Sequence, residues 1–130
     1  MEGQSGGQAV IGKSIVIVED DVLLSQTVSI GLRKRGHCVT VFHTGADALS
    51  YLSRERPDLL LLDIKLPDCD GWFLARLLER LELSDRMPLI MMSVLEPDRR
   101  MVAEVRPYAY LQKPFDMGHL MQTVEASLGG

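Results

Sequence analysis

Two hydrophobic patterns alternate along this chain. Five short runs are almost continuously aliphatic or β-branched, as expected for strands that are buried on both faces of a parallel sheet. These runs are Ser14–Val18, Cys38–Phe42, Leu59–Leu62, Leu89–Met92 and Tyr108–Leu111. The segments that follow them place apolar residues three or four positions apart, which is the spacing of a helix with one buried face.

The helical segments also carry start signals. Thr44 and Asp47 form a capping pattern, Asp70 suits the position before a helix, and Pro97 suits a first helical turn. The stripes predicted to face the core are Leu24, Val28, Leu32; Ala48, Leu49, Leu52; Phe73, Leu77, Leu78, Leu81; Met101, Val102, Val105; and Met117, Leu120, Met121, Val124, Leu128.

Five strand–helix alternations predict an α/β fold, a doubly wound parallel sheet of five strands with helices on both faces and right-handed crossovers. The length of 130 residues fits one domain. We place this domain at residues 13–128, after a glycine-rich stretch (1–12) that suggests a flexible tail or a cloning remnant, and before a short tail (129–130). In such folds ligands bind at the carboxyl ends of the strands, where the strand order reverses.

Composition narrows the function. Apolar residues make up 46% and charged residues 25% of the chain, which is ordinary for a globular protein. A net charge of −4 argues against general binding of nucleic-acid phosphates. No apolar stretch approaches the roughly 20 residues of a membrane span, and no secretory signal is visible, so we expect a cytoplasmic protein. Two cysteines, Cys38 and Cys69, make neither a disulfide framework nor a zinc site.

Polar side chains cluster where the predicted strands end. Glu19, Asp20 and Asp21 follow the first strand, and Asp63 follows the third. Ser93 and Lys113 stand after the fourth and fifth strands. Because the carboxyl ends of parallel strands meet at one edge of the sheet, we expect these groups to converge on one site.

The chemistry of this set favours a metal and a phosphoryl group. Carboxylates that lie close together repel one another, and a divalent cation removes that penalty. Hard oxygen ligands suit Mg²⁺. Beside a metal, Asp63 can attack phosphorus to give an aspartyl phosphate, while Ser93 and Lys113 can bind the phosphoryl oxygens. We assign Asp21 to capping the first helix.

These motifs resemble the receiver (CheY-like) domain of two-component response regulators. The resemblance covers about Lys13 to Leu128, and it implies a flavodoxin-like sheet with strand order 2-1-3-4-5. The segments that carry it are Ile15–Asp21, Leu60–Gly71, Pro88–Ser93 and Tyr110–Phe115.

The resemblance implies a role for each acidic residue. Asp63 would accept a phosphoryl group from a phosphohistidine on a sensor histidine kinase or phosphotransfer protein. Glu19 and Asp20 would hold Mg²⁺ together with Asp63, and the backbone carbonyl of Lys65 would complete the metal site. The domain would be a signalling module and no ordinary enzyme, although it would catalyse its own phosphorylation and dephosphorylation.

The resemblance also implies a switch. Binding of the phosphoryl group by Ser93 and Lys113 would draw Ser93 inward, and Tyr110 would move from an exposed to a buried rotamer. The face formed by the helix after Pro97, the fifth strand and the last helix would change, and a partner or output domain would read that change. In this family the bond between Lys113 and Pro114 is often cis.

Two features depart from the family pattern. Val94 follows Ser93 where the family usually has alanine or glycine, and its β-branched side chain predicts slower phosphoryl exchange. Ser93 and Lys113 are only 20 positions apart, and Pro107 disfavours helix at Arg106. The fourth helix is therefore expected to be short, shifted or mobile. The last helix lacks the charged pattern of receivers that dimerise through the fourth helix, the fifth strand and the last helix, so we do not predict that dimer.

Other functions remain possible for this layout. A pseudo-receiver would act through protein contacts alone. A phosphatase of the haloacid dehalogenase type would need a second acid where Lys65 stands. A flavin-binding module would need a phosphate cradle after the first strand, where Glu19, Asp20 and Asp21 would repel phosphate.

Overall fold

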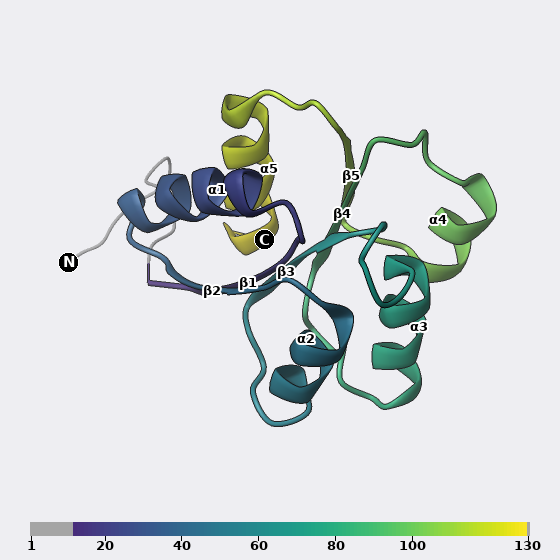
Figure 1. The fold of residues 1–130 in the computed structure, drawn as a ribbon. Helices are drawn as coiled ribbons and strands as arrows, with labels where there is room; N and C mark the ends of the chain where they lie inside the picture. The colour runs from purple at the N-terminus through teal and green to yellow at the C-terminus, as the bar shows by residue number, and fades with distance from the viewer. Residues whose placement is uncertain (1–11, 130) are drawn as a thin grey trace.

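The computed structural model describes residues 12–129, which form a single five-stranded sheet covered by helices on both faces (Figure 1). The strands are β1 (Ser14–Val18), β2 (Cys38–Phe42), β3 (Leu59–Asp63), β4 (Leu89–Ser93) and β5 (Ala109–Gln112). The helices are α1 (Val22–Lys34), α2 (Gly45–Leu52), α3 (Gly71–Arg80), α4 (Arg99–Val105) and α5 (Met117–Gly129).

All neighbouring strands are parallel, in the order β2-β1-β3-β4-β5, which confirms the predicted fold class and strand order. The order reverses beside β1, so the ends of β1 and β3 face the same crevice. The tail predicted for residues 1–12 lies outside the described residues except for Gly12, and so does Gly130. Gly129 is the last residue of α5.

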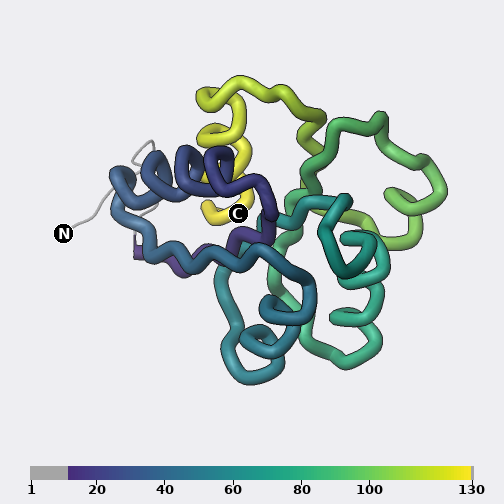
Figure 2. Tube along the Cα trace, viewed as in Figure 1, coloured from purple at the N-terminus to yellow at the C-terminus, as the bar shows by residue number. Residues whose placement is uncertain are grey.

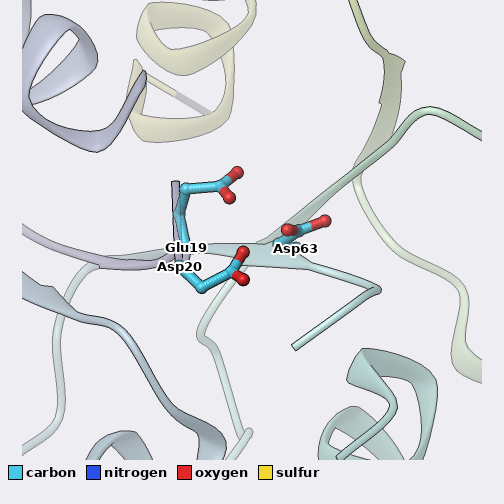
Figure 3. Close-up of side chains that lie close together, drawn as sticks. All are labelled: Glu19, Asp20 and Asp63. Carbon is cyan, nitrogen blue, oxygen red and sulfur yellow. The ribbon is translucent and has the colours of Figure 1, made fainter. Parts of the chain in front are cut away.

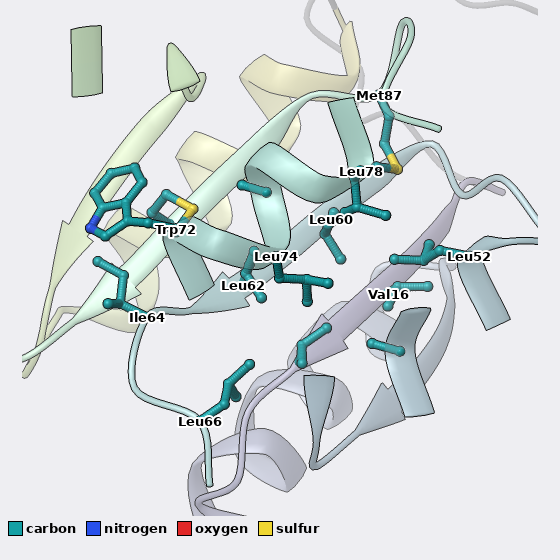
Figure 4. Packing of buried hydrophobic residues seen from close by; sticks show 14 residues of the cluster. Val16, Leu52, Leu60, Leu62, Ile64, Leu66, Trp72, Leu74, Leu78 and Met87 are labelled. Carbon is teal, nitrogen blue, oxygen red and sulfur yellow. The ribbon is translucent and has the colours of Figure 1, made fainter. Parts of the chain in front are cut away.

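The sheet separates two cores, because successive residues of a strand point to opposite faces. One core packs against α2 and α3, and the other packs against α1 and α5. The residues of β1 and β3 in the first core are Val16, Val18, Leu60 and Leu62, and those in the second are Ile15, Ile17, Leu59 and Leu61. Figure 4 shows the first core, where β3 lies beneath α3.

Acidic or hydroxyl side chains begin four of the helices, as good N-caps do. Asp21 accepts from the Leu24 amide, Thr44 from the Asp47 amide and Asp70 from the Trp72 amide. The fourth helix differs from the prediction: Asp98 caps it, so α4 begins at Arg99 and Pro97 lies just outside the first turn.

The buried stripe of α3 is not the predicted one. Phe73 and Leu81 are 61% and 50% exposed, while the buried residues include Leu74, Ala75 and Leu78. The cause lies at the start of the helix. The Gly71 amide donates to the Ile64 carbonyl at 2.6 Å, and a Cβ on Gly71 would collide with the backbone of Asp63 and Ile64. This close approach fixes the rotation of α3 about its axis.

The fourth helix is short, as the spacing predicted. It has seven residues, and none of these described residues is buried. It ends where Arg106 adopts a left-handed conformation (φ 55°, ψ 59°) just before Pro107. Figure 2 shows the long excursion of the chain from β4 through α4 and back to β5, beside α3. Across residues 12–129, we find no helix that combines the length and apolar character of a membrane crossing.

Candidate functional site

Three carboxylates meet at the ends of β1 and β3 (Figure 3). One oxygen from each of Glu19, Asp20 and Asp63 lies within 4.8 Å of the others. The sheet register brings them together, because Val18 pairs with Leu62 and the next residues, Glu19 and Asp63, therefore lie side by side. The predicted convergence of the acidic residues is thus present.

Burial makes this cluster electrostatically demanding. Glu19 is 1% exposed and Asp63 is 3% exposed, whereas Asp20 faces solvent. The pKa of Glu19 is raised to about 7, mainly by burial and in smaller part by the negative charge of Asp63. The hydrogen bonds that Glu19 accepts from Lys113 and the Asp21 amide act in the opposite direction. A nearby positive charge would therefore stabilise the ionised carboxylates of this site.

Lys113 supplies one such charge from the end of β5. Its Nζ lies 2.6 Å from Glu19 Oε1 and 3.3 Å from Asp63 Oδ2. Burial alone would lower the pKa of Lys113, but the two carboxylates outweigh it and raise the pKa above its ordinary value. The backbone amide of Lys113 donates to the Ser93 carbonyl at 2.7 Å, and the Lys113–Pro114 bond is cis.

Ser93 and Tyr110 both connect to one residue in the loop after β4. Ser93 is 1% exposed, and its Oγ accepts a hydrogen bond from the Leu95 amide at 3.0 Å. The half-buried Tyr110 donates its hydroxyl to the Leu95 carbonyl at 2.7 Å. The Tyr110 ring stacks on Trp72 with centroids 6.1 Å apart and planes 21° from parallel. Leu95 thus lies between the site serine and the tyrosine.

Comparison with known sequences decides the family. The response regulator receiver domain matches residues 15–125 of this chain. The chain belongs to the receiver domain family. It is a signalling domain of two-component systems.

The receiver domain resembles a longer bacterial regulator. It is 32% identical over 103 residues to the transcriptional regulatory protein AfsQ1 of Streptomyces coelicolor. That match spans 78% of this chain but only 44% of AfsQ1, so the chain corresponds to less than half of that relative.

Two solved structures have the same fold. A CheY-like receiver domain protein from Methanospirillum hungatei JF-1 is 27% identical, with a TM-score of 0.83 over 91% of this chain and 94% of that one. The receiver domain of the sensor histidine kinase PA1611 from Pseudomonas aeruginosa PAO1 is 30% identical, with a TM-score of 0.81 over 92% and 99% of the two chains. The PA1611 domain is described with a magnesium ion coordinated in its active-site cleft.

The acidic cluster of this receiver domain opens into a hollow of about 420 Å³. Lys65 and Pro67 line one side, and Val94, which is 60% exposed, lines another. The Lys65 amide lies 3.3 Å from Asp63 Oδ1, so the chain after Asp63 curls back over its own carboxylate. The metal-binding role of the Lys65 carbonyl stays a prediction.

Sequence reasoning missed two partners of this receiver site. Leu95 contacts Ser93 and Tyr110 through its backbone amide and carbonyl, so the identity of its side chain could not reveal these contacts. The partnership of Trp72 with Tyr110 joins positions that lie far apart in the sequence. The position of Trp72 directly after Gly71, near the acceptor, was the one available clue.

Proposed function

We propose that Asp63 is the phospho-acceptor of this receiver domain. The observation that carries the proposal is the position of its carboxylate, at the end of a buried strand, 3.3 Å from Lys113 Nζ and next to Glu19 and Asp20. A carboxylate so placed has a cation for the incoming phosphoryl oxygens and an open hollow for the donor to enter.

The same residues fit Mg²⁺. Glu19, Asp20 and Asp63 present only oxygen ligands and open to a hollow with room for water and phosphate, which is the environment that Mg²⁺ prefers. The backbone carbonyl of Lys65 would join them. Bound there, the ion would supply positive charge to the transferring phosphoryl group. The magnesium ion of the PA1611 domain supports this assignment.

In the transfer step, an oxygen of Asp63 attacks the phosphorus of a phosphohistidine. A P–O bond forms, the P–N bond breaks, and the imidazole leaves with the electron pair and takes up a proton. Lys113 shifts its hydrogen bond from Glu19 toward a phosphoryl oxygen. Hydrolysis later returns Asp63 to its free form, so the domain handles one phosphoryl group per cycle.

The switch follows from the contacts of Leu95. When Ser93 turns its hydroxyl toward a phosphoryl oxygen, the Leu95 amide loses its present acceptor. The loop then moves, and the Leu95 carbonyl no longer holds the Tyr110 hydroxyl in place. Tyr110 is thereby released to a new rotamer, and α4, β5 and α5 present a changed face to an output partner.

The donor must bring its histidine into the hollow, so it must cover the surrounding rim. Aliphatic side chains with little cover lie there: Val94, 60% exposed, lines the acidic hollow, and Leu23, 75% exposed, lines a neighbouring hollow that also contains Val94 and Lys113. We infer that a sensor kinase or phosphotransfer protein docks here, in the cytoplasm, and that this domain makes no direct nucleic-acid contact.

Val94 narrows this entrance. Its exposed side chain lines the hollow beside Lys113. We expect Val94→Ala to react faster with a small phosphodonor, because two methyl groups leave the path to Asp63. Equal rates for parent and variant in a time course of intact mass would refute this role.

The test of the proposed function is intact mass after incubation with Mg²⁺ and acetyl phosphate. We expect a gain of one phosphoryl group in the parent and in Asp47→Ala, an exposed aspartate on α2, and none in Asp63→Ala or without Mg²⁺. If no gain occurs even with a panel of donor kinases, the domain is a pseudo-receiver that acts by contact alone.

A further inference from the structure

The loop that follows the phospho-acceptor is fastened to a different helix. In this loop, which runs from residue 65 to residue 70, Asp68 accepts two backbone hydrogen bonds from the start of α2. The Gly45 amide donates to Oδ1 at 2.8 Å and the Ala46 amide donates to Oδ2 at 2.9 Å. These bonds lower the pKa of Asp68, so the carboxylate stays charged and the bonds stay charge-assisted.

Cys69 presses the loop against the same helix turn. A Cβ on Gly45 would overlap Cys69 Sγ, so the two segments approach as closely as they do because residue 45 has no side chain. The next neighbours of that Cβ, Asp68 Oδ1 at 3.4 Å and Leu66 Cδ1 at 3.7 Å, leave ordinary room. We call the two Asp68 bonds and the Cys69–Gly45 contact the α2 clamp.

The helix on which the clamp closes is itself fixed to the core. Ala48 and Leu52 of α2 are 0% and 1% exposed and pack in the core beneath α3. Thr44 accepts from the Asp47 amide, so the helix start does not depend on Asp68 alone. The loop is therefore held in place relative to a rigid part of the molecule.

The other end of the loop lies at the phosphorylation site. The backbones of Lys65 and Asp70 form an isolated antiparallel β-bridge. Within it, the Leu66 amide donates to the Cys69 carbonyl at 3.2 Å. The Lys65 amide lies 3.3 Å from Asp63 Oδ1. These contacts make the loop a closed unit, so a displacement at Asp68 or Cys69 reaches Lys65 and Asp63.

We infer that Asp68 is a positioning residue: through the α2 clamp it holds the Lys65 carbonyl and the Asp63 carboxylate in the arrangement that binds Mg²⁺. This inference rests on the proposed function, because it assigns Asp68 to the metal site of that function. Outer partners that orient metal ligands typically change metal affinity by about 10- to 100-fold when they are removed.

The experiment compares Mg²⁺ affinity in Asp68→Ala, Asp68→Asn and Asp47→Asn. Calorimetric titration well below the melting temperature should give an affinity for Asp68→Ala about 10-fold weaker than for the parent. Asp68→Asn should fall between them, because its amide keeps one acceptor oxygen. Asp47→Asn also removes one negative charge near the start of α2, but no hydrogen bond of the clamp uses the Asp47 side chain, so the parent affinity should remain.

A second set of variants tests the clamp without changing charge. Gly45→Ala should weaken Mg²⁺ binding, because the new methyl group pushes Cys69 away. Gly45→Ala combined with Cys69→Ala should restore it, because the overlapping sulfur is gone. Hydrogen exchange without Mg²⁺ should show faster exchange at the Gly45 and Ala46 amides in Asp68→Ala, which reports the clamp independently of the metal.

Parent-like Mg²⁺ affinity in Asp68→Ala, together with faster exchange at the two amides, would overturn the inference. If Asp68→Ala does not fold, the Gly45→Ala and double variants decide, and equal affinities in these two would also overturn it. Failure of the proposed function looks different: the parent itself then takes up no phosphoryl group, whatever the Asp68 variants do.

Discussion

The segments that follow β3 and β4 both begin at a site residue, yet they are built in opposite ways. After Asp63, the chain is closed by short-range backbone bonds, held by the α2 clamp and continued by α3, half of whose ten residues are buried. After Ser93, an exposed stretch from residue 94 to residue 98 leads to α4, none of whose described residues is buried. The segment after Asp63, which we call the acceptor side, is thus held firmly. The segment from Val94 through α4 to β5, which we call the reading side, has few buried contacts.

This difference matches two requirements of a phosphoryl switch. Transfer needs reacting groups held in a fixed geometry, whereas a signal needs an element that changes position at low cost. Few buried contacts make α4 such an element.

Lys113 is the point where β5, on the reading side, contributes to the rigid site. We expect Lys113→Met to slow phosphorylation of Asp63 on the order of 100-fold, because one charged donor to the phosphoryl oxygens is lost. Gln112→Met, at the exposed neighbouring position, should keep nearly the parent rate. Time courses of intact mass with acetyl phosphate measure both, and similar rates in the two variants would contradict the role of Lys113.

Two valines probe the packing on each side of the contrast. Val18 in β1 is 0% exposed, and Val102 in α4 is only partly buried. Val18→Ala should lower the free energy of unfolding by about 2–3 kcal/mol, and Val102→Ala by less than about 1 kcal/mol. Urea denaturation of the two variants gives the comparison. A similar loss in both would mean that α4 is as firmly held as the sheet.

Glu19 makes the rigid site sensitive to pH when Mg²⁺ is chelated. Its pKa is about 7 in the folded chain and near 4.5 when exposed, so the folded state holds the proton more tightly. The resulting stabilisation is complete below pH 4.5 and is lost as the pH rises through 7. In EDTA, the parent should lose about 2 kcal/mol more than Glu19→Gln between these limits. Parallel stability curves for parent and variant would rule this out.

The smallest effect concerns the end of α4. Arg106 holds a left-handed conformation that costs an L-residue free energy and suits glycine. Arg106→Gly should therefore raise the free energy of unfolding by up to about 1 kcal/mol. Arg35, which ends α1 with φ −91°, is the matched control, because Arg35→Gly relieves no such strain. Thermal melts of both variants suffice, and a loss of stability in Arg106→Gly would refute the prediction.

The sequence was most informative where the type of a residue and its place in a strand determine its environment. The run Leu59–Leu62 predicted a buried strand, and Glu19, Asp20, Asp63 and Lys113 could be placed together because parallel strands end at one edge. The pattern also predicted the shortness of α4, since Pro107 restricts the residue before it.

It was least informative where distant backbone decides the outcome. The helical spacing predicts that Phe73 faces the core, yet Phe73 is exposed. The reason is that the contact between Gly71 and the Asp63 backbone sets the rotation of α3, and this contact cannot be predicted from the spacing. The bonds of Asp68 to α2 join a loop to a helix earlier in the chain and leave no periodic trace. The carbonyl of Lys65 and the movement of Tyr110 stay predictions.

The parallel arrangement of the sheet also bears on how the domain is made. Glu19 and Asp63 come from adjacent strands that are separated in the chain by α1, β2 and α2. Parallel pairs of this kind cannot form as local hairpins, and they assemble only after long loops have closed. The acidic pocket therefore does not exist in a nascent or partly folded chain. A molecule that can be phosphorylated is one in which this parallel sheet has already assembled.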